Sequence, residues 1–539
     1  MHWLVRWMDG AAGSTRTAVS TPAGDVTLGE LVSAVAELAD RLGTELARSV
    51  VAVRFPRGDP KGLVATLAAW RVGAVPLFMD IAAGSHPPLL VAAGARFELA
   101  PSAGAQLAVG SGPGLTASVD LRSTGIDIEA PRPLVSEAAY VISTSGSTAQ
   151  PRLCVNRGAS LRNTVLGLVD RFQLDDQART LQFAPYNYDA WLGDALPTLW
   201  AGGVLIYGTP GPWSTFGAVV RRIHEGAVTH AVAPPSVWAR LEVDCGLRVA
   251  VSAGEALAPG LARRLRGFAD VVVNAYGPSE AAVCATTHIC AAADDQLDSV
   301  PLGVPLPGVE LDVVPTEREG VGLLRIRGAG VAAGYLGHDP SEGALEGFDA
   351  DERGAYFQTS DLVREVGGEI MHVGRSDRAV KRHGRLVDLD RVEAAVRDLP
   401  DVLESVVFES DGRLVCQYAS SGEIVDPGTR LGQVLEAWEV PQRWHRVGDF
   451  ARGPSDKLLR GAYDERSPLD PVSEIWAEVL GRPPSKGSFF ALGGDSTLAM
   501  ELIAEVQNRC GVEVELADFV ADPTLSFLLE QVHDPAEST

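Results

Sequence analysis

The sequence contains few cysteines and no long hydrophobic run. Its six cysteines, among 539 residues, are scattered without a C-x-x-C pair or a metal-ligand spacing, which predicts reduced, structural thiols in a cytosolic protein. No apolar stretch approaches the roughly 18 residues that a membrane-spanning helix needs, and the N-terminal segment lacks the apolar region of a signal peptide. We therefore expect a cytoplasmic protein that has no membrane partner.

Positive charge is also scarce. The chain has 46 basic and 70 acidic residues, and its formal net charge of −24 disfavours wide contact with a nucleic-acid backbone. Only four of the basic residues are lysines, namely Lys61, Lys381, Lys457 and Lys486. The position of a lysine in this chain is therefore informative.

The length predicts three or four structural units, at roughly 100–200 residues per domain. Hydrophobic residues make up 46% and charged residues 22% of the chain, which is ordinary for a globular protein. Residues 1 to about 335 alternate helix-like stretches with short apolar runs, the pattern of a large α/β domain with buried strands. Residues 310–375 then change to short strands and turns, which predict a small sheet beside that domain.

The last third of the chain predicts two smaller units. An α+β domain is expected after residue 377, with helices near 390–398 and 431–438 and strands near 402–409 and 413–418. The segment 467–539 has 13 acidic and three basic residues, and we expect a separate acidic helical module there.

A first candidate site is a loop rich in hydroxyl groups and glycine, Tyr140-Val-Ile-Ser-Thr-Ser-Gly-Ser-Thr-Ala149-Gln-Pro-Arg152. It follows an apolar strand and ends on a cation, so its backbone N–H groups, hydroxyls and charge suit a polyphosphate. The loop is not a Walker A motif, because the G-x-x-x-x-G-K-[ST] pattern is absent from the chain. Taken alone, it is equally compatible with an ordinary surface loop.

Two further candidate sites follow predicted strands. Asn274-Ala-Tyr-Gly-Pro-Ser-Glu280 comes after an apolar strand, where open α/β sheets place ligands, and offers an amide, a ring and a carboxylate for a base and a magnesium ion. Asp361 lies after a predicted turn and could accept both hydroxyls of a ribose, with Arg375 facing phosphate or sugar. A solvated turn with a surface ion pair is the alternative for this second group.

Two more motifs lie near the C-terminus. Lys457, in Pro-Ser-Asp-Lys-Leu-Leu-Arg, could neutralise negative charge that develops in a transition state. Ser496, in Gly-Gly-Asp-Ser, precedes a predicted amphipathic helix. A hydroxyl at a helix N-terminus suits a phosphodiester, although a simple helix cap is the alternative.

These five segments, in this order and spacing, resemble the adenylation domain of nonribosomal peptide synthetases fused to a peptidyl carrier domain. The resemblance covers essentially the whole chain. It implies a large α/β domain over residues 1–376, a small α+β subdomain over 377–465 and an acidic four-helix carrier bundle over 468–535. It also implies a two-step reaction, in which a carboxylate attacks the α-phosphorus of Mg-ATP and the resulting acyl-AMP then acylates a phosphopantetheine thiol.

The resemblance assigns roles residue by residue. The residues expected to handle the phosphates are Thr144, Ser145, Gly146, Ser147, Thr148 and Arg152. The residues expected to bind the nucleotide are Gly254, Glu255, Ala256, Asn274, Tyr276, Gly277, Ser279, Asp361 and Arg375. Glu280 would hold Mg²⁺, Lys457 would bridge the substrate carboxylate and phosphate, and Ser496 would carry phosphopantetheine. Asp377 matches the hinge about which the small subdomain swings, exchanging Lys457 for the 378–385 loop.

The sequence departs from the family pattern at four positions. Ala149 and Leu153 stand where the family has glycine, and Ser360 replaces the glycine of Thr-Gly-Asp. Arg152 replaces a lysine but keeps the charge. An alanine at a position that needs φ > 0 costs roughly 1 kcal/mol, so these changes bear on the rate and on pyrophosphate handling.

The segment Tyr186-Asn-Tyr-Asp189-Ala-Trp-Leu-Gly193 resembles the place where amino-acid-activating members hold the substrate α-ammonium with an aspartate. A buried Asp189 requires a cation, which favours an α-amino acid over an aryl or fatty acid. The expected pocket lining is small or apolar throughout: Ala190, Gly193, Val232, Val251, Ala253, Ala275, Val283 and Cys284. Because Gly193 should deepen the pocket, we expect a large aromatic substrate: tryptophan, tyrosine or a ring-substituted phenylalanine.

Three alternatives remain open at this point. An acyl- or aryl-CoA ligase of the same superfamily would share the ATP motifs but lack Asp189 and the C-terminal module. A degenerate, non-catalytic carrier scaffold would turn over no nucleotide. A serine hydrolase acting through Ser496 needs a G-x-S-x-G elbow, which Gly494-Asp-Ser-Thr-Leu does not provide.

The resemblance also implies partners. A phosphopantetheinyl transferase would modify Ser496, and a tailoring or condensing enzyme would act in trans on the loaded carrier. Some members of the family also bind a small MbtH-like helper protein. The acidic terminal module should favour basic patches on these partners.

Overall fold

We analysed the protein as a computed structural model. It describes residues 1–79, 87–101, 119–124, 137–144, 152–208, 216–241, 246–336, 347–382, 385–400, 402–410, 413–420, 427–432, 434–436, 438–447, 450, 471–480, 488–490, 496–510, 512, 514–525, 527–528 and 531. The chain divides into two compact units, one formed by residues 1–378 and the other beginning at Ala379.

The central sheet of the first unit has nine strands among the described residues. In spatial order they are β15 (Val304–Pro305), β14 (Thr286–Ile289), β13 (Ala269–Tyr276), β12 (Leu247–Ala253), β11 (His230–Ala233), β9 (Arg179–Leu181), β10 (Val204–Ile206), β1 (Thr17–Thr21) and β2 (Gly24–Thr27). Strands β11, β12 and β13 pair in parallel, so their carboxyl ends meet at one edge. The second candidate motif begins where β13 ends, at that edge.

A seven-stranded sheet completes the α/β part. Its strands are β18 (Gly334–Tyr335), β8 (Arg152–Arg157), β7 (Ala138–Thr144), β4 (Val75–Met79), β3 (Val50–Arg54), β5 (Phe97–Pro101) and β6 (Val119–Ser123). Strands β3 and β4 are apolar and buried along almost their whole length, as parallel strands covered on both faces usually are.

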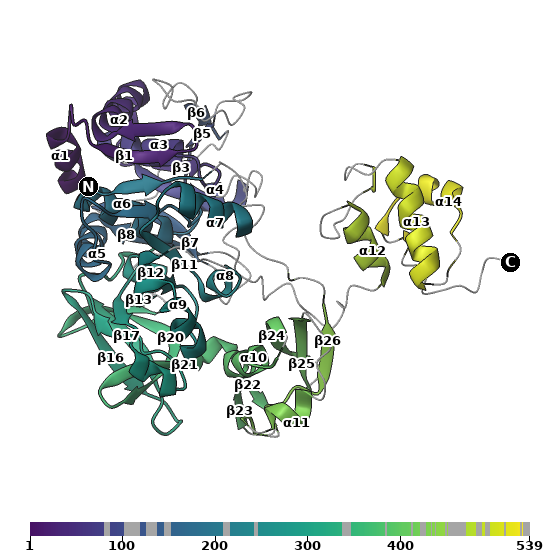
Figure 1. Ribbon diagram of the computed structural model, residues 1–539. Coiled ribbons are helices and arrows are strands. Elements are labelled where there is room, and N and C mark those ends of the chain that lie inside the picture. The colour runs from purple at the N-terminus through teal and green to yellow at the C-terminus, as the bar shows by residue number, and fades with distance from the viewer. Residues whose placement is uncertain are drawn as a thin grey trace. The chain divides into compact units, whose positions relative to one another are not determined.

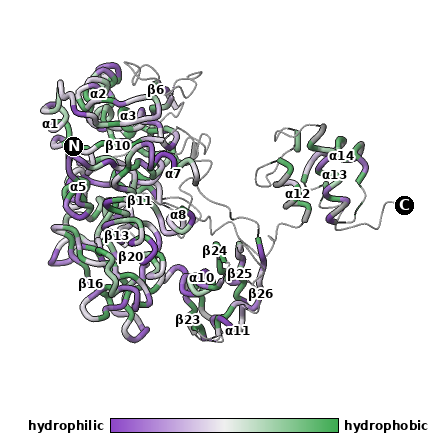
Figure 2. The backbone as a smooth tube through the Cα atoms, viewed as in Figure 1, coloured by the Kyte–Doolittle hydropathy of each residue, from purple (hydrophilic) through white to green (hydrophobic). Residues whose placement is uncertain are grey.

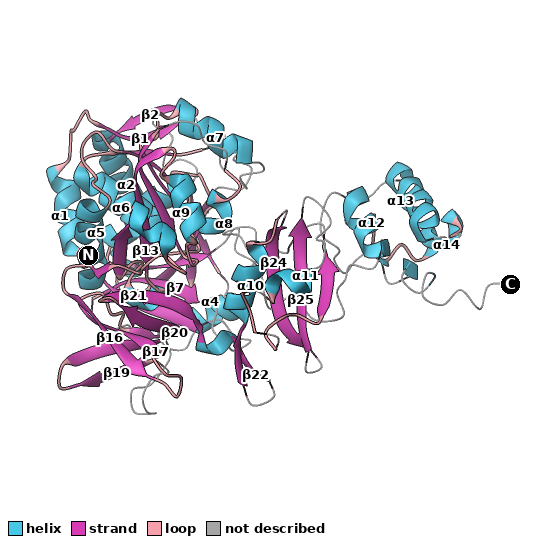
Figure 3. Cartoon of the chain, turned by 60° about the horizontal axis from the view of Figure 1, so that its bottom comes forward, coloured by secondary structure: helices cyan, strands magenta, loops and turns pink. Residues whose placement is uncertain are grey.

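Helices flank these strands, as Figure 3 shows in cyan and magenta. They are α1 (His2–Gly10), α2 (Leu28–Leu42), α3 (Lys61–Arg71), α4 (Pro87–Ala93), α5 (Gly158–Arg171), α6 (Ala190–Ala201), α7 (Phe216–Glu225), α8 (Pro235–Trp238) and α9 (Pro259–Leu265). Helix α2 starts with a capping box, in which Thr27 and Glu30 each bond the other's backbone N–H, and it buries its apolar face. Helix α6 begins after Asp189 and ends at Ala201, and the following Gly202 has φ +94°.

A smaller antiparallel sheet ends the first unit. It contains β16 (Val309–Pro315), β17 (Gly322–Gly328), β20 (Gly354–Val366) and β19 (Phe348–Asp351), with β21 (Glu369–Arg375) paired to β20. The register places Asp361 of β20 directly opposite Arg375 of β21. The short strands and turns expected for residues 310–375 are therefore present (Figure 1).

The second unit starts with the hairpin β22 (Ala379–Arg382) and β23 (Arg385–Asp388), followed by α10 (Leu389–Arg397), β24 (Val402–Ser410), β25 (Arg413–Ser420), α11 (Pro427–Leu431) and β26 (Arg443–Arg446). The helix expected near residues 431–438 is wrong, because α11 ends at Leu431. Gly432 follows, and the carboxylate of Glu439 accepts the backbone N–H of Glu436 in a turn. A glycine is the usual residue after a helix end.

The C-terminal helices are α12 (Pro471–Leu480), α13 (Ser496–Cys510) and α14 (Leu516–Ala521). They share their own hydrophobic core, to which Trp476, Phe489, Leu502, Val506 and Phe519 contribute. Hydrophobic and hydrophilic stretches both occur along α13 in Figure 2, as the predicted amphipathic helix requires. Within the part of the chain that the structure describes, no helix combines the length and apolar character needed to cross a membrane.

Candidate active site

The expected phosphate loop connects the two strands of a hairpin. β7 and β8 pair antiparallel, with Thr144 opposite Arg152, so the ends of the loop are adjacent. The guanidinium carbon of Arg152 lies 5.5 Å from the centre of the Tyr335 ring. Leu153, which stands where the family has glycine, is buried on β8. Residues 145–151, with Ser145, Gly146, Ser147, Thr148 and Ala149, lie outside the described residues, as does Lys457.

The turn after β13 is packed against the backbone of the next segment. A Cβ added to Gly277 would lie 2.5 Å from Cα of Cys284, so this close approach needs glycine. Glu280 is buried, and its carboxylate accepts a hydrogen bond of 2.7 Å from the Tyr335 hydroxyl. Tyr335 therefore contacts both Arg152 and Glu280, and the sequence analysis did not predict a role for it.

Three side chains converge on Asp361, which is 5% exposed. The Tyr276 hydroxyl donates to its Oδ2 at 2.5 Å, Arg375 donates to its Oδ1 at 3.1 Å, and Nε2 of His372 lies 3.6 Å from Oδ1. Burial alone would raise the pKa of Asp361, but the nearby His372, the charge of Arg375 and the hydrogen bond from Tyr276 lower it below its usual value. Asp361 is therefore an anion at neutral pH, joined directly to Tyr276.

Arg375 also binds the predicted hinge residue. Its guanidinium donates to both carboxylate oxygens of Asp377, at 2.8 and 2.7 Å, while it bonds Asp361. Beside this contact, the Ser376 hydroxyl donates to the Ser360 carbonyl at 3.0 Å. One side chain thus connects the residue predicted to bind ribose with the residue predicted to act as the hinge.

Other expected nucleotide-binding residues already have protein partners. Asn274 is buried and donates through Nδ2 to the Pro301 carbonyl at 2.8 Å. The carboxylate of Glu255 accepts from the backbone N–H and the hydroxyl of Ser236, at 3.1 and 3.0 Å. The residues on either side of Glu255 are exposed: Gly254 and Ala256.

Asp189 occupies the N-cap position of α6, just before Ala190, and is 7% exposed. Its Oδ2 accepts a hydrogen bond of 3.3 Å from the Tyr140 hydroxyl, and its Oδ1 accepts one of 3.1 Å from the Ser279 hydroxyl. Ser279, which we expected to bind nucleotide, thus contacts the residue that we expected to bind the amino acid.

Most of the expected pocket lining belongs to one hydrophobic cluster: Val232, Val251, Ala253, Ala275, Val283 and Cys284. Val283 has φ +79° and follows Ala282 with φ +52°, which is an unusual conformation for a β-branched residue. The Thr164 hydroxyl donates to the Ala282 carbonyl at 2.8 Å and so supports this turn. Strained backbone of this kind often occurs at functional sites.

Gly193 faces this strained turn. A Cβ added to Gly193 would lie 3.1 Å from Cγ1 of Val283 and 3.7 Å from Cδ1 of Leu168. Val283 therefore already occupies space beside Gly193. In the predicted pocket, the available depth would therefore depend on Val283 as well as on Gly193.

A second buried acid, Asp194, lies on the same helix and was not identified from the sequence. It is 1% exposed, and its Oδ2 accepts the backbone N–H groups of Phe183 and Ala184 at 3.2 and 3.1 Å. Its Oδ1 has no hydrogen-bond partner among the described residues. Burial raises the pKa of Asp194 to about 8, so it is mostly protonated at neutral pH. An acid inside the otherwise apolar helix α6 was the available sequence signal.

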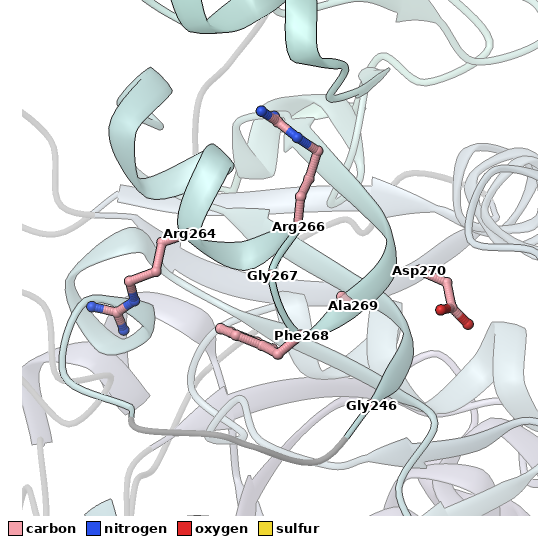
Figure 4. Close-up of a pocket in the computed structure, with 7 residues that line it drawn as sticks. All are labelled: Gly246, Arg264, Arg266, Gly267, Phe268, Ala269 and Asp270. Carbon is pink, nitrogen blue, oxygen red and sulfur yellow. The ribbon is translucent and has the colours of Figure 1, made fainter.

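A pocket elsewhere on the first unit does not belong to this site. It lies at the amino ends of β12 and β13, between Gly246 and Asp270 (Figure 4). Arg264 there donates to the carbonyls of Trp238, Ala239 and Leu241, and Arg266 pairs with Asp295 at 2.6 Å. These contacts fix the fold at the edge opposite the candidate site.

The donor set is compatible with Mg-ATP. Among the described residues, no three metal-ligating side chains form a cluster. Magnesium in nucleotide sites is usually held by one or two carboxylates together with phosphate oxygens and water, so the single carboxylate of Glu280 suffices. Tyr276 and Asp361 offer a ring and an ionised carboxylate that suit a nucleoside. For the carrier, α13 begins at Ser496, whose side chain lies outside the described residues.

Comparisons with known proteins give the family. The AMP-binding enzyme family matches residues 9–336, and the phosphopantetheine attachment site family matches residues 470–532. Novobiocin biosynthesis protein H of Streptomyces niveus is 30% identical over 535 residues, covering 89% of this chain and 87% of that protein. Phosphinothricin tripeptide synthetase PhsC of Streptomyces viridochromogenes is 32% identical, covering 96% of this chain and 51% of its own length.

Solved structures support the fold. Holo-AB3403, a four-domain nonribosomal peptide synthetase bound to AMP and glycine, aligns over 99% of this chain and 42% of its own with a TM-score of 0.70 and 22% identity. The o-succinylbenzoate CoA synthetase MenE of Bacillus subtilis aligns over 86% of this chain and 98% of its own, with a TM-score of 0.70 and 19% identity. The chain thus spans about half of PhsC and less than half of the four-domain synthetase. The chain belongs to the AMP-binding enzyme family, as an adenylate-forming ligase domain followed by a phosphopantetheine carrier domain, the arrangement of nonribosomal peptide synthetases.

Proposed function

We propose that the protein activates an α-amino acid as its aminoacyl-AMP and loads it onto its own carrier domain. The observation that carries the proposal is Asp189, a buried carboxylate at the N-cap of α6 that accepts hydrogen bonds from the hydroxyls of Tyr140 and Ser279, two residues of the candidate active site. A carboxylate removed from water is stable when a cation pairs with it, and an α-ammonium is such a cation. An aryl or fatty acid has no ammonium group to offer to Asp189.

In the proposed first step, an oxygen of the substrate carboxylate attacks the α-phosphorus of ATP. The bond to the β-phosphate breaks, and pyrophosphate leaves. Tyr276 and Asp361 would hold the nucleoside, Arg152 would face the phosphates, and Glu280 would hold the Mg²⁺ that offsets phosphate charge. Further roles remain proposals by family likeness, at Thr144, Ser145, Gly146, Ser147, Thr148, Gly254, Glu255, Ala256, Asn274, Gly277, Ser279, Arg375 and Lys457.

The second step transfers the acyl group to the carrier. Ser496 would carry a phosphopantetheine arm, attached by a phosphopantetheinyl transferase, whose thiol would form a thioester with the acyl carbon. The bond from that carbon to AMP would break, AMP would leave, and the thiol proton would pass to solvent. Asp377 would be the hinge between the two steps. A tailoring or condensing enzyme would then act on the loaded carrier, and a small MbtH-like protein is a candidate helper.

We propose a large aromatic amino acid as the substrate: tryptophan, tyrosine or a ring-substituted phenylalanine. The support is the apolar lining, in which Val232, Val251 and Ala275 present no hydrogen-bonding side chain. A buried phenol would need a partner there, which favours rings without a hydroxyl group. Because Val283 lies against Gly193, these two positions together set the size of ring that enters.

The test is amino-acid-dependent ATP–pyrophosphate exchange by the purified full chain, across the proteinogenic amino acids and a few aryl acids. Strong exchange with one aromatic amino acid supports the proposal. Exchange with aryl acids alone would instead indicate an aryl-acid ligase, whose substrate has no ammonium group to pair with Asp189. Mass spectrometry of the modified protein then follows loading, with Ser496→Ala as the variant that keeps exchange and accepts no acyl group.

A further inference from the structure

Asp189 is held from both sides by hydroxyl groups. Tyr140 bonds its Oδ2 and Ser279 bonds its Oδ1, so each oxygen accepts one hydrogen bond from a neutral donor. Hydrogen bonds from neutral hydroxyl groups do not cancel the charge of a carboxylate. These two contacts help to fix the orientation of the Asp189 carboxylate.

The surroundings of Tyr140 hold its side chain in place for this contact. It lies in the middle of β7, is fully buried, and its ring centre is 5.7 Å from that of Phe78. Phe78 in turn meets the edge of Trp191 on α6 at 5.2 Å, so the same aromatic cluster supports both the tyrosine and the helix that presents Asp189. Burial, and then the charge of Asp189, raises the pKa of Tyr140 well above its usual value. Its hydroxyl is therefore always protonated and donates to the carboxylate.

Tyr140 also lies on the strand that leads to the expected phosphate loop. β7 continues from Tyr140 to Thr144, where the expected phosphate loop begins. The strand that leads into the proposed nucleotide site thus also fixes the carboxylate of the proposed amino-acid site.

We propose that Tyr140 is a positioning residue that orients Asp189 toward the α-ammonium of the substrate. This inference rests on the proposed function, because it assumes that Asp189 binds an ammonium group. Tyr140 touches no reacting atom, so it acts on amino-acid recognition through Asp189 and leaves nucleotide recognition unchanged.

The test compares Tyr140→Phe with Tyr207→Phe in the full chain. Tyr207 is also a fully buried tyrosine of the same core cluster, but its hydroxyl lies 3.4 Å from that of Tyr186 and does not contact Asp189. Exchange is measured while the amino acid and ATP are varied separately. We expect Tyr140→Phe to raise the KM for the amino acid about tenfold, the effect of losing one hydrogen bond to a charged group, and to change the KM for ATP less than twofold. Tyr207→Phe should leave both values unchanged.

A double variant separates positioning from general loosening of the core. Once Asp189→Asn has removed the charge, adding Tyr140→Phe should cause little further loss, because both changes act on the same interaction. Losses that multiply, or an equal rise in both KM values, would overturn the inference. If Asp189→Asn itself keeps full exchange with the amino acid, the proposed function fails. If Asp189→Asn loses exchange while Tyr140→Phe keeps the wild-type KM for the amino acid, only this inference fails.

Discussion

Two buried aspartates five residues apart on α6 have different surroundings. Asp189, at the N-cap, accepts hydrogen bonds from the side chains of Tyr140 and Ser279, which come from two segments of the candidate active site. Asp194, inside the helix, accepts hydrogen bonds from the backbone N–H groups of Phe183 and Ala184, and burial raises its pKa to about 8. Burial alone therefore does not identify a functional acid.

The difference lies in what surrounds each carboxyl. The backbone N–H groups of Phe183 and Ala184 favour the charged form of Asp194, but burial outweighs them. A neutral Asp194 needs no cation and holds the segment that leads to Asp189. We interpret Asp194 as the structural acid of this pair and Asp189 as the recognition acid.

The largest expected effect is on the recognition acid. Asp189→Asn should lower kcat/KM for amino-acid-dependent exchange by at least about 100-fold, because an ammonium buried without its counter-ion loses about 3–5 kcal/mol. The control is Asp194→Asn, the same change five residues away, which should retain exchange within a fewfold of the wild type. Equal losses in the two variants would remove the distinction between the aspartates.

For Asp194, the free energy of unfolding should depend on the hydrogen-bond acceptor that its side chain provides, and not on its charge. Asp194→Ala leaves the N–H groups of Phe183 and Ala184 buried without an acceptor, and we expect the free energy of unfolding to fall by about 2–4 kcal/mol. Asp194→Asn keeps a carbonyl oxygen and should lose clearly less. Thermal or denaturant unfolding measures both. Equal destabilisation by alanine and asparagine would show that the two amide contacts contribute little.

The sequence analysis proposed Asp189 as the recognition acid and did not identify Asp194. Asp189 lies in a segment whose neighbours carry a family pattern, and the motifs around Asp361 and Glu280 were found in the same way. Tyr140, Tyr335 and Asp194 act through contacts with residues far away in the chain, and no local pattern encodes those contacts.

The fold shows the same division between local and long-range information. Helix α2 (Leu28–Leu42) depends on local features, namely a capping box at its start and the helical spacing of its buried apolar residues. The prediction of a helix near residues 431–438 was wrong: α11 ends at Leu431, and the Glu439 carboxylate accepts the backbone N–H of Glu436 in a turn. The contact of Val283 with Gly193 likewise depends on a left-handed turn that sequence alone does not reveal.

Because Asp194 is buried and its pKa is raised, its contribution to the free energy of unfolding should depend on pH. Between its unfolded pKa of about 4 and its folded pKa of about 8, the folded protein keeps a proton that the unfolded chain has lost. The contribution of Asp194 to stability therefore decreases as pH rises through this range, by up to about 1.4 kcal/mol per pH unit, and levels off above it. Unfolding of the wild type and Asp194→Asn at pH 6, 7, 8 and 9 isolates this contribution. A constant difference between them would mean that Asp194 titrates normally.

The smallest expected effect comes from Gly193, which lies between the two aspartates. In Gly193→Ala the new Cβ would lie 3.1 Å from Cγ1 of Val283, so Val283 must move by a few tenths of an ångström. Neither carboxyl loses a partner, and we expect stability to change by less than about 1 kcal/mol. Exchange should shift a fewfold toward smaller side chains, because the methyl group occupies pocket space. Val283→Ala in the same chain should reverse that shift, since it removes the atom that the new methyl meets. If the preference moves equally toward substrates without an α-amino group, Gly193 acts on Asp189 rather than on the side-chain pocket.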